Sequence, residues 1–134
     1  MIRVKRKMVL IENVLGAISD DKSLILFKTI ANSKPNSEVL IATTQLTRKQ
    51  YYSRMVRLMK TDLVKRENGK YTLTTFGEVV YYAETIVESA VENLWKLKAV
   101  DSFEVTDALS KEELTKVMDT LIDNEKIKQI LLAK

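Results

Sequence analysis

Apolar side chains recur every three or four residues along most of the chain, a spacing that places them on one face of a helix. Leu24, Phe27 and Ile30 follow this spacing, and the candidate N-cap residues near the start of this helix are Asp20, Asp21 and Ser23. The apolar stretch 8–18 fits either a helix or a strand, and we favour a helix. The pattern predicts a mostly α protein with helices over about 8–18, 22–32, 38–43, 48–60, 76–98, 111–122 and 125–133.

Capping sequences predict where three of these helices begin. In the stretch TRKQ, the Thr47 hydroxyl can accept from the amide of Gln50, and the Gln50 side chain can reach back to the amide of Thr47. Thr75 and Glu78 repeat this capping box ahead of the helix over 76–98. Ser110 can cap the helix over 111–122.

The stretch VKRENGKYTLT, residues 64–74, predicts a β-hairpin, because Asn-Gly favours a turn with positive φ at both central residues. That turn pairs Arg66 with Tyr71 and Val64 with Leu73, and it places all four side chains on one face. We expect Val64 and Leu73 to pack inward and Arg66 to lie over the Tyr71 ring.

The residue types present argue against an enzyme. The chain has no cysteine and no histidine, which removes disulfides, thiolate nucleophiles, Cys/His zinc sites and the usual imidazole base. The sequence also lacks a calcium-loop spacing, a glycine-rich phosphate loop and a GxSxG elbow. We therefore expect no catalytic site, no cofactor and no metal.

The N-terminus resembles a signal peptide, but Glu12 and Asn13 interrupt its apolar run, so we do not expect one. No apolar stretch approaches the ~20 residues needed to span a bilayer. We expect a cytoplasmic protein without a membrane partner.

Charge divides the chain into a basic half and an acidic half. Residues 1–70 hold 15 Lys and Arg against 6 Asp and Glu, whereas residues 71–134 hold 7 against 12. Within the basic half, residues 47–70 alone carry a net charge of +6. Such an imbalance indicates that the basic half binds a polyanion.

The order of capped helix and basic hairpin carries a family resemblance, in the residues TRKQYYSRMVRLMKTDLVKRENGKYTLTTFG, 47–77. The chain resembles the winged helix-turn-helix transcriptional regulators, especially the small one-domain regulators of archaea. In that group a short step like Asp62-Leu63-Val64 leads from the recognition helix into the wing, although many relatives have glycine where Asp62 stands. Asp tolerates the left-handed conformation that this turn needs. The resemblance covers about 21–98.

The resemblance implies a recognition helix over about 48–60 in the DNA major groove, and a wing over 64–74 on the backbone or in the minor groove. Cationic and polar residues of the helix and hairpin could contact phosphates and base edges. The basic face could instead be only a solvated surface. Tyr51 is more suited to the core than to DNA contact, and Tyr52 could either contact DNA or pack partially. Arg54 could be only a charge on the helix surface. The predicted contact residues are Thr47, Arg48, Lys49, Tyr52, Ser53, Arg57, Lys65, Arg66 and Lys70.

A heptad seam runs along the predicted long helix, which suggests self-association. Its residues are Val80, Ala83, Val87, Ala90, Leu94 and Leu97. The seam could instead pack within its own chain. We expect a homodimer and three regions: a basic N-terminal arm or short helix over 1–20, a DNA-binding domain over 21–75 and a helical dimerisation region over 76–134.

The sequence thus predicts a mostly α, α+β winged helix-turn-helix protein that binds specific double-stranded DNA as a transcriptional regulator. The alternative is a winged-helix protein-interaction module in a transcription or replication assembly, since fold does not fix function. The pattern specifies no operator, no effector and no choice between activation and repression.

Overall fold

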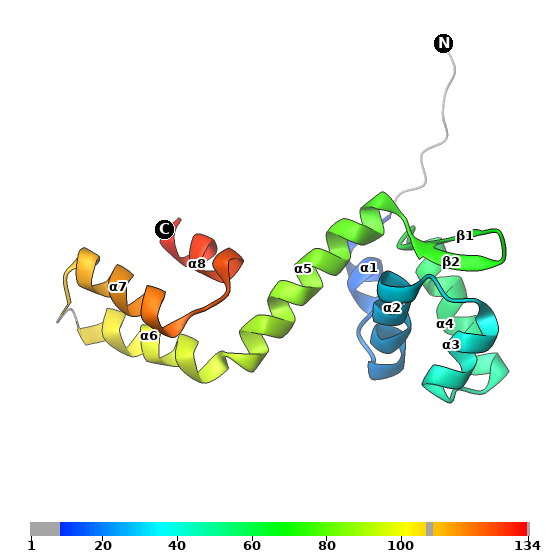
Figure 1. Ribbon diagram of the computed structural model, residues 1–134, viewed down its shortest axis with the longest axis horizontal. Helices are drawn as coiled ribbons and strands as arrows, with labels where there is room; N and C mark the ends of the chain where they lie inside the picture. Colours follow the sequence, from blue (N-terminus) through cyan, green and yellow to red (C-terminus); the bar gives the residue numbers. More distant parts are fainter. Residues whose placement is uncertain (1–8, 107–108, 134) are drawn as a thin grey trace, which may run out of the picture. The chain divides into compact units, whose positions relative to one another are not determined.

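The computed structural model describes residues 9–106 and 109–133, and it confirms a mostly helical α+β fold (Figure 1). Within these residues the chain forms eight helices and one two-stranded antiparallel sheet. The elements are α1 Ile11–Ala17, α2 Asp21–Ser33, α3 Ser37–Thr44, α4 Arg48–Lys60, β1 Val64–Glu67, β2 Lys70–Leu73, α5 Thr75–Glu92, α6 Leu94–Thr106, α7 Lys111–Leu121 and α8 Glu125–Leu132.

The chain forms two compact units, Met1–Tyr81 and Tyr82–Lys134, so that α5 begins in the first unit and ends in the second. The N-terminal stretch is helical, as we favoured, and α1 buries Val14 and Ala17 in the core of the first unit. The division of the chain into regions of different function stays a prediction.

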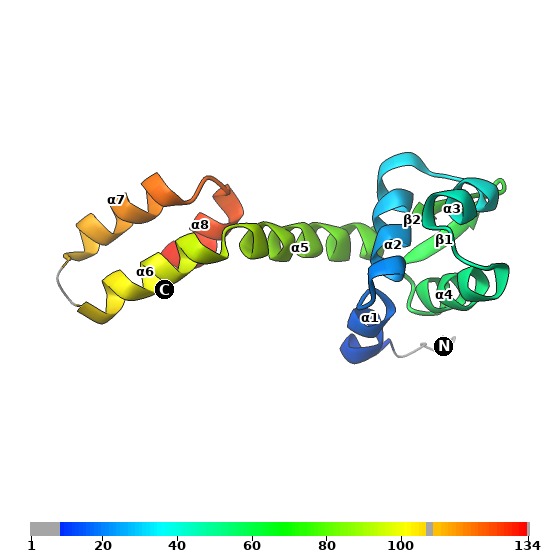
Figure 2. The same ribbon diagram turned by 90° about the horizontal axis from the view of Figure 1, so that it is seen from below.

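The core of the first unit joins helices α1 to α4 with the hairpin. Its fully buried members include Leu26, Phe27 and Ile30 of α2, together with Tyr51 and Leu58 of α4. The helical spacing of these residues in the sequence is therefore the spacing of a buried face. Figure 2 shows the hairpin strands and α4 within this unit.

The hairpin has the predicted register, with Val64 opposite Leu73 and Arg66 opposite Tyr71. Asn68 and Gly69 both have positive φ, 53° and 77°, as the predicted turn requires. The outer edge of β2 is also engaged, because the Tyr71 amide donates to the Pro35 carbonyl over 2.9 Å. The loop between α2 and α3 thus fixes the hairpin against the helices.

The predicted caps of α4 and α7 are confirmed, whereas the cap of α5 differs from the prediction. Thr47 and Gln50 form the reciprocal capping box, and Ser110 accepts from the amide of Glu113. At α5 the hydroxyl of Thr74, one residue earlier than predicted, accepts from the Gly77 amide over 2.8 Å. The Thr74 hydroxyl also donates to the Asp62 carbonyl, which secures the junction between the hairpin and its neighbours.

The prediction of one continuous helix over 76–98 is wrong, because the helix is interrupted at Asn93. The Asn93 side chain donates to the Ser89 carbonyl over 2.8 Å, and the Asn93 carbonyl accepts from the amides of Lys96 and Leu97. Asn93 therefore ends α5 and starts α6. A heptad pattern that continues through such a break cannot reveal it.

The second unit has a small core of its own. It buries Val100 of α6, Met118 of α7, the C-cap residue Ile122 that follows α7, and Ile127 of α8. Helices α6 and α7 lie side by side (Figures 1 and 2). The Asn124 side chain caps α8 by accepting from the Ile127 amide. In the described part of the chain, no helix combines the length and apolar character required to cross a membrane.

Candidate nucleic-acid interface

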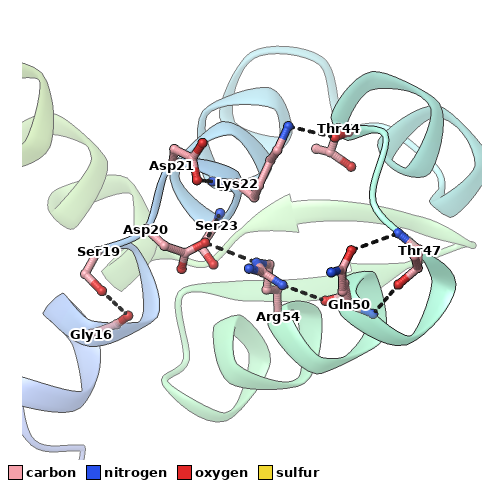
Figure 3. Close-up of polar contacts among 10 residues, drawn as sticks. All are labelled: Gly16, Ser19, Asp20, Asp21, Lys22, Ser23, Thr44, Thr47, Gln50 and Arg54. Atoms are coloured by element: carbon pink, nitrogen blue, oxygen red, sulfur yellow. Dashed lines mark hydrogen bonds and ion pairs between the residues drawn. The ribbon is translucent and has the colours of Figure 1, made fainter.

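Helix α4 follows α3 after a short turn, and contacts in that turn together with an N-terminal capping box fix where the helix begins. Gln45, in the left-handed conformation with φ 57°, ends α3, and buried Leu46 anchors the turn. The Lys22 ammonium donates to the Thr44 carbonyl over 3.2 Å, which ties α2 to the end of α3 (Figure 3). The capping box of Thr47 then defines the first turn of α4.

An ion pair holds the middle of α4 against α2. Arg54 Nε donates to Asp20 Oδ2 over 3.1 Å, and Asp20 is at the same time the N-cap residue of α2 (Figure 3). Burial alone would raise the pKa of Asp20, but hydrogen bonds from Ser23 and Arg54, together with the Arg54 charge, lower it to about 2. Arg54 is therefore a structural residue of α4, directed away from its outer face.

Tyr51 lies on the inner face of α4 and is fully buried in the core, as predicted. Burial raises the pKa of the Tyr51 hydroxyl to about 12. Ser37 lowers this pKa and Tyr71 raises it, both by smaller amounts than burial. The Tyr52 ring packs edge-on against the Tyr51 ring, with 5.2 Å between centroids, while half of Tyr52 stays exposed. Tyr52 thus combines partial packing with an accessible surface.

The outer face of α4 is exposed and mixes cationic, polar and apolar side chains. The predicted contact residues exposed on α4 are Arg48, Lys49, Tyr52, Ser53 and Arg57, and Thr47 is exposed with its hydroxyl engaged in the cap. Lys60 is a further exposed cation at the end of the helix.

Arg57 lies toward α1. A Cβ placed on Gly16 of α1 would stand 3.3 Å from Arg57 Nη2, so the guanidinium packs beside that helix. We therefore expect Arg57 to contribute less to binding than Arg48 or Lys49.

The three predicted cations of the hairpin have different surroundings. Arg66 lies over the Tyr71 ring, with 5.8 Å from Cζ to the centroid, as the register predicted. Lys65 pairs with Glu67 on the same strand over 3.0 Å. Because both side chains are at least half exposed, this pair contributes little to stability and is easily exchanged for another partner.

Lys70 lines a shallow cavity of about 230 Å³ at the solvent face of the hairpin, together with Lys34, Glu67, Asn68 and Thr72. Lys34 was missed by sequence reasoning. It is the C-cap residue of α2 in the left-handed conformation, φ 46°, and the hydrogen bond from the Tyr71 amide to the adjacent Pro35 carbonyl holds this loop beside the hairpin.

The predicted dimerisation seam divides between packed and exposed residues. Val80 packs against the core of the first unit, and Ala90 and Leu97 pack against the core of the second. Ala83, Val87 and Leu94 are exposed. Val91 and Trp95, outside the predicted seam, are also exposed, at 68% and 65%.

Comparisons of the chain with protein-family models, curated proteins and solved structures return no match. In residues 9–106 and 109–133, no group of three acidic side chains comes together as a metal site. The candidate site therefore rests on geometry and charge alone.

Proposed function

We propose that the protein is a sequence-specific double-stranded DNA-binding transcriptional regulator with a winged helix-turn-helix. The observation that carries this proposal is the division of α4 into a buried face and an exposed cationic face, directly followed by a hairpin with three cations. The buried face of Tyr51, Met55 and Leu58 leaves the opposite side of the helix free to enter a groove.

In the proposed complex, α4 is the recognition helix and lies in the major groove, which admits one α-helix. Arg48 and Lys49 stand in its first turn, where recognition helices contact base edges and phosphates. The hairpin is the wing, and Arg66 and Lys70 meet the adjacent backbone or minor groove. Lys34 extends this cationic surface beside the wing.

We further propose that the protein binds DNA as a homodimer through its second unit. Val87 and Val91 are one helical turn apart on α5, and both are more than 60% exposed. Leu94 and Trp95 follow within four residues and are more than half exposed. Large apolar side chains so close along an acidic unit are suited to contact with a second copy. Two recognition helices would then lie about 34 Å apart on a pseudo-palindromic site.

A protein-interaction module is the second candidate, and one observation favours it. Tyr52, Val56 and Met59 are exposed apolar residues on the outer face of α4, and a protein groove could accept them. This candidate predicts weak DNA binding with a shallow salt dependence and a stoichiometric protein partner.

Fluorescence anisotropy on labelled duplex DNA across a salt series tests the proposal. Because each neutralised phosphate releases a counterion, we expect log K to fall steeply and linearly with log salt concentration. Affinity at low salt no greater than that of a neutral protein would refute DNA binding.

The double substitution of Arg48→Ala and Lys49→Ala should weaken DNA binding by at least about tenfold and reduce the salt slope by about 1–2. Far-UV circular dichroism should stay unchanged, since both side chains are exposed. The matched control is Lys98→Ala with Lys116→Ala, which removes two exposed lysines from the second unit. Equal affinity of the two double variants would place the interface elsewhere.

A further inference from the structure

Three apolar side chains form a stripe along the outer face of α4. Tyr52, Val56 and Met59 follow the spacing i, i+4, i+7, which aligns residues on one side of a helix. They are 51%, 46% and 39% exposed, although α4 already buries a separate apolar face in the core. Tyr52 contributes to packing through the Tyr51 ring, but about half or less of each of the three side chains remains accessible to a partner.

The charges around the stripe restrict what it can contact. Arg48 and Lys49 precede it and Lys60 follows it, and all three are exposed. A partner that matches this surface offers anionic groups near both ends of the stripe and an apolar group between them. Double-stranded DNA meets this requirement, because phosphates line the major groove and the C5-methyl group of thymine is the apolar group on its floor.

We infer that Tyr52, Val56 and Met59 contact thymine methyl groups, so that the binding site of this protein contains fixed A·T pairs opposite the middle of α4. The inference rests on the proposed function and adds the kind of base that the helix reads. Val56 is central, because it lies one turn from Tyr52 and nearly one turn from Met59 and presents two methyl groups to the groove. Arg48 and Lys49, in the first turn, remain available for guanine or phosphate.

Selection of bound sites from random duplex DNA, followed by thymine-to-deoxyuridine replacement, tests this inference. Deoxyuridine pairs with adenine as thymidine does, and it differs from thymidine only in lacking the C5-methyl group. For the full chain on its best selected site, complete replacement should weaken binding about fourfold for each methyl group that the stripe covers.

The Val56→Ala variant provides the decisive comparison. It should bind the thymine duplex more weakly than wild type and should lose much of the difference between the thymine and deoxyuridine duplexes. The matched control is Val79→Ala, which truncates a 65% exposed valine on α5 and should keep the full difference.

The outcomes separate this inference from the proposed function. Tight, salt-dependent binding with equal affinity for both duplexes, or selected sites without fixed A·T pairs, would overturn thymine contact while DNA binding stands. Absence of DNA binding would overturn both, and a protein partner lost in Val56→Ala would then assign the stripe to protein recognition.

Discussion

Asp20 connects two helices through one carboxylate. It caps α2 by accepting from the Ser23 amide over 3.1 Å, and the same Oδ2 accepts from Arg54 of α4. Cap and ion pair together orient α4 relative to α2, and hence the outer face that we propose for DNA. The carboxylate must be ionised to hold Arg54, which makes this contact dependent on pH.

Asp20→Asn isolates the ion pair, because Asn also caps helices well. We expect a loss of about 1 kcal/mol in the free energy of unfolding at pH 7, since the Asp20 side chain is 36% exposed and solvent screens the pair. The pKa of Asp20 is lowered from 3.8 to about 2, so its stabilisation is present above about pH 4 and is lost as the pH falls toward 2. Urea titrations of the wild type and Asp20→Asn at pH 7 and at pH 3 measure the difference in unfolding free energy at each pH.

Asp21→Asn is the matched control for Asp20→Asn. It makes the same change of charge at an exposed neighbour, whose side chain accepts from the adjacent Lys22 amide. A wild-type advantage over Asp20→Asn that is the same at pH 3 as at pH 7 would contradict the role of the ionised carboxylate.

The junction of the hairpin with α5 depends on a close approach of two backbones. Gly77, in the first turn of α5, lies so near Leu63 that a Cβ would stand 2.0 Å from the Leu63 carbonyl oxygen. Leu63 and the Thr74 cap therefore set where α5 leaves the hairpin. Glycine is required here by space, because its φ is not in the left-handed region.

Gly77→Ala should lower the free energy of unfolding by about 1–3 kcal/mol, because the backbones must separate. Without this contact, the same change inside a helix stabilises by about 0.5–1 kcal/mol. Gly16→Ala is the control, since its Cβ would meet only the flexible end of Arg57 at 3.3 Å. Urea denaturation of both variants gives the comparison, and a stability of Gly77→Ala equal to that of Gly16→Ala would show that the close approach is not tight.

At the scale of the whole molecule, the acidic second unit carries the exposed apolar residues that we assign to self-association. Sedimentation equilibrium should give a mass of about twice 15.4 kDa. The double substitution of Val87→Glu and Val91→Glu should raise the dissociation constant of the dimer at least about tenfold, because it places two carboxylates in an apolar contact.

Ser102→Glu is the control for this shift. It adds a carboxylate at an exposed polar position of α6 and should leave the mass unchanged. A wild-type chain that stays monomeric at all concentrations would refute the dimer without bearing on DNA binding by a single copy.

Features encoded within a few residues were predictable from the sequence. The Thr47 capping box and the register around Asn68 and Gly69 depend on neighbours in the chain, so propensity and spacing suffice to identify them. The break at Asn93 was not predictable, because the apolar spacing continues through it.

The sequence by itself determined most of the helices, the hairpin and the concentration of positive charge in residues 47–70, because local hydrogen bonding and periodicity act over short spans. Tertiary structure decided what the cations of this surface contact. Arg54 pairs with Asp20 across 34 residues, Arg57 packs beside Gly16, and Lys34 joins the hairpin through Pro35. Each depends on contacts between distant segments, which exist only once the core has formed.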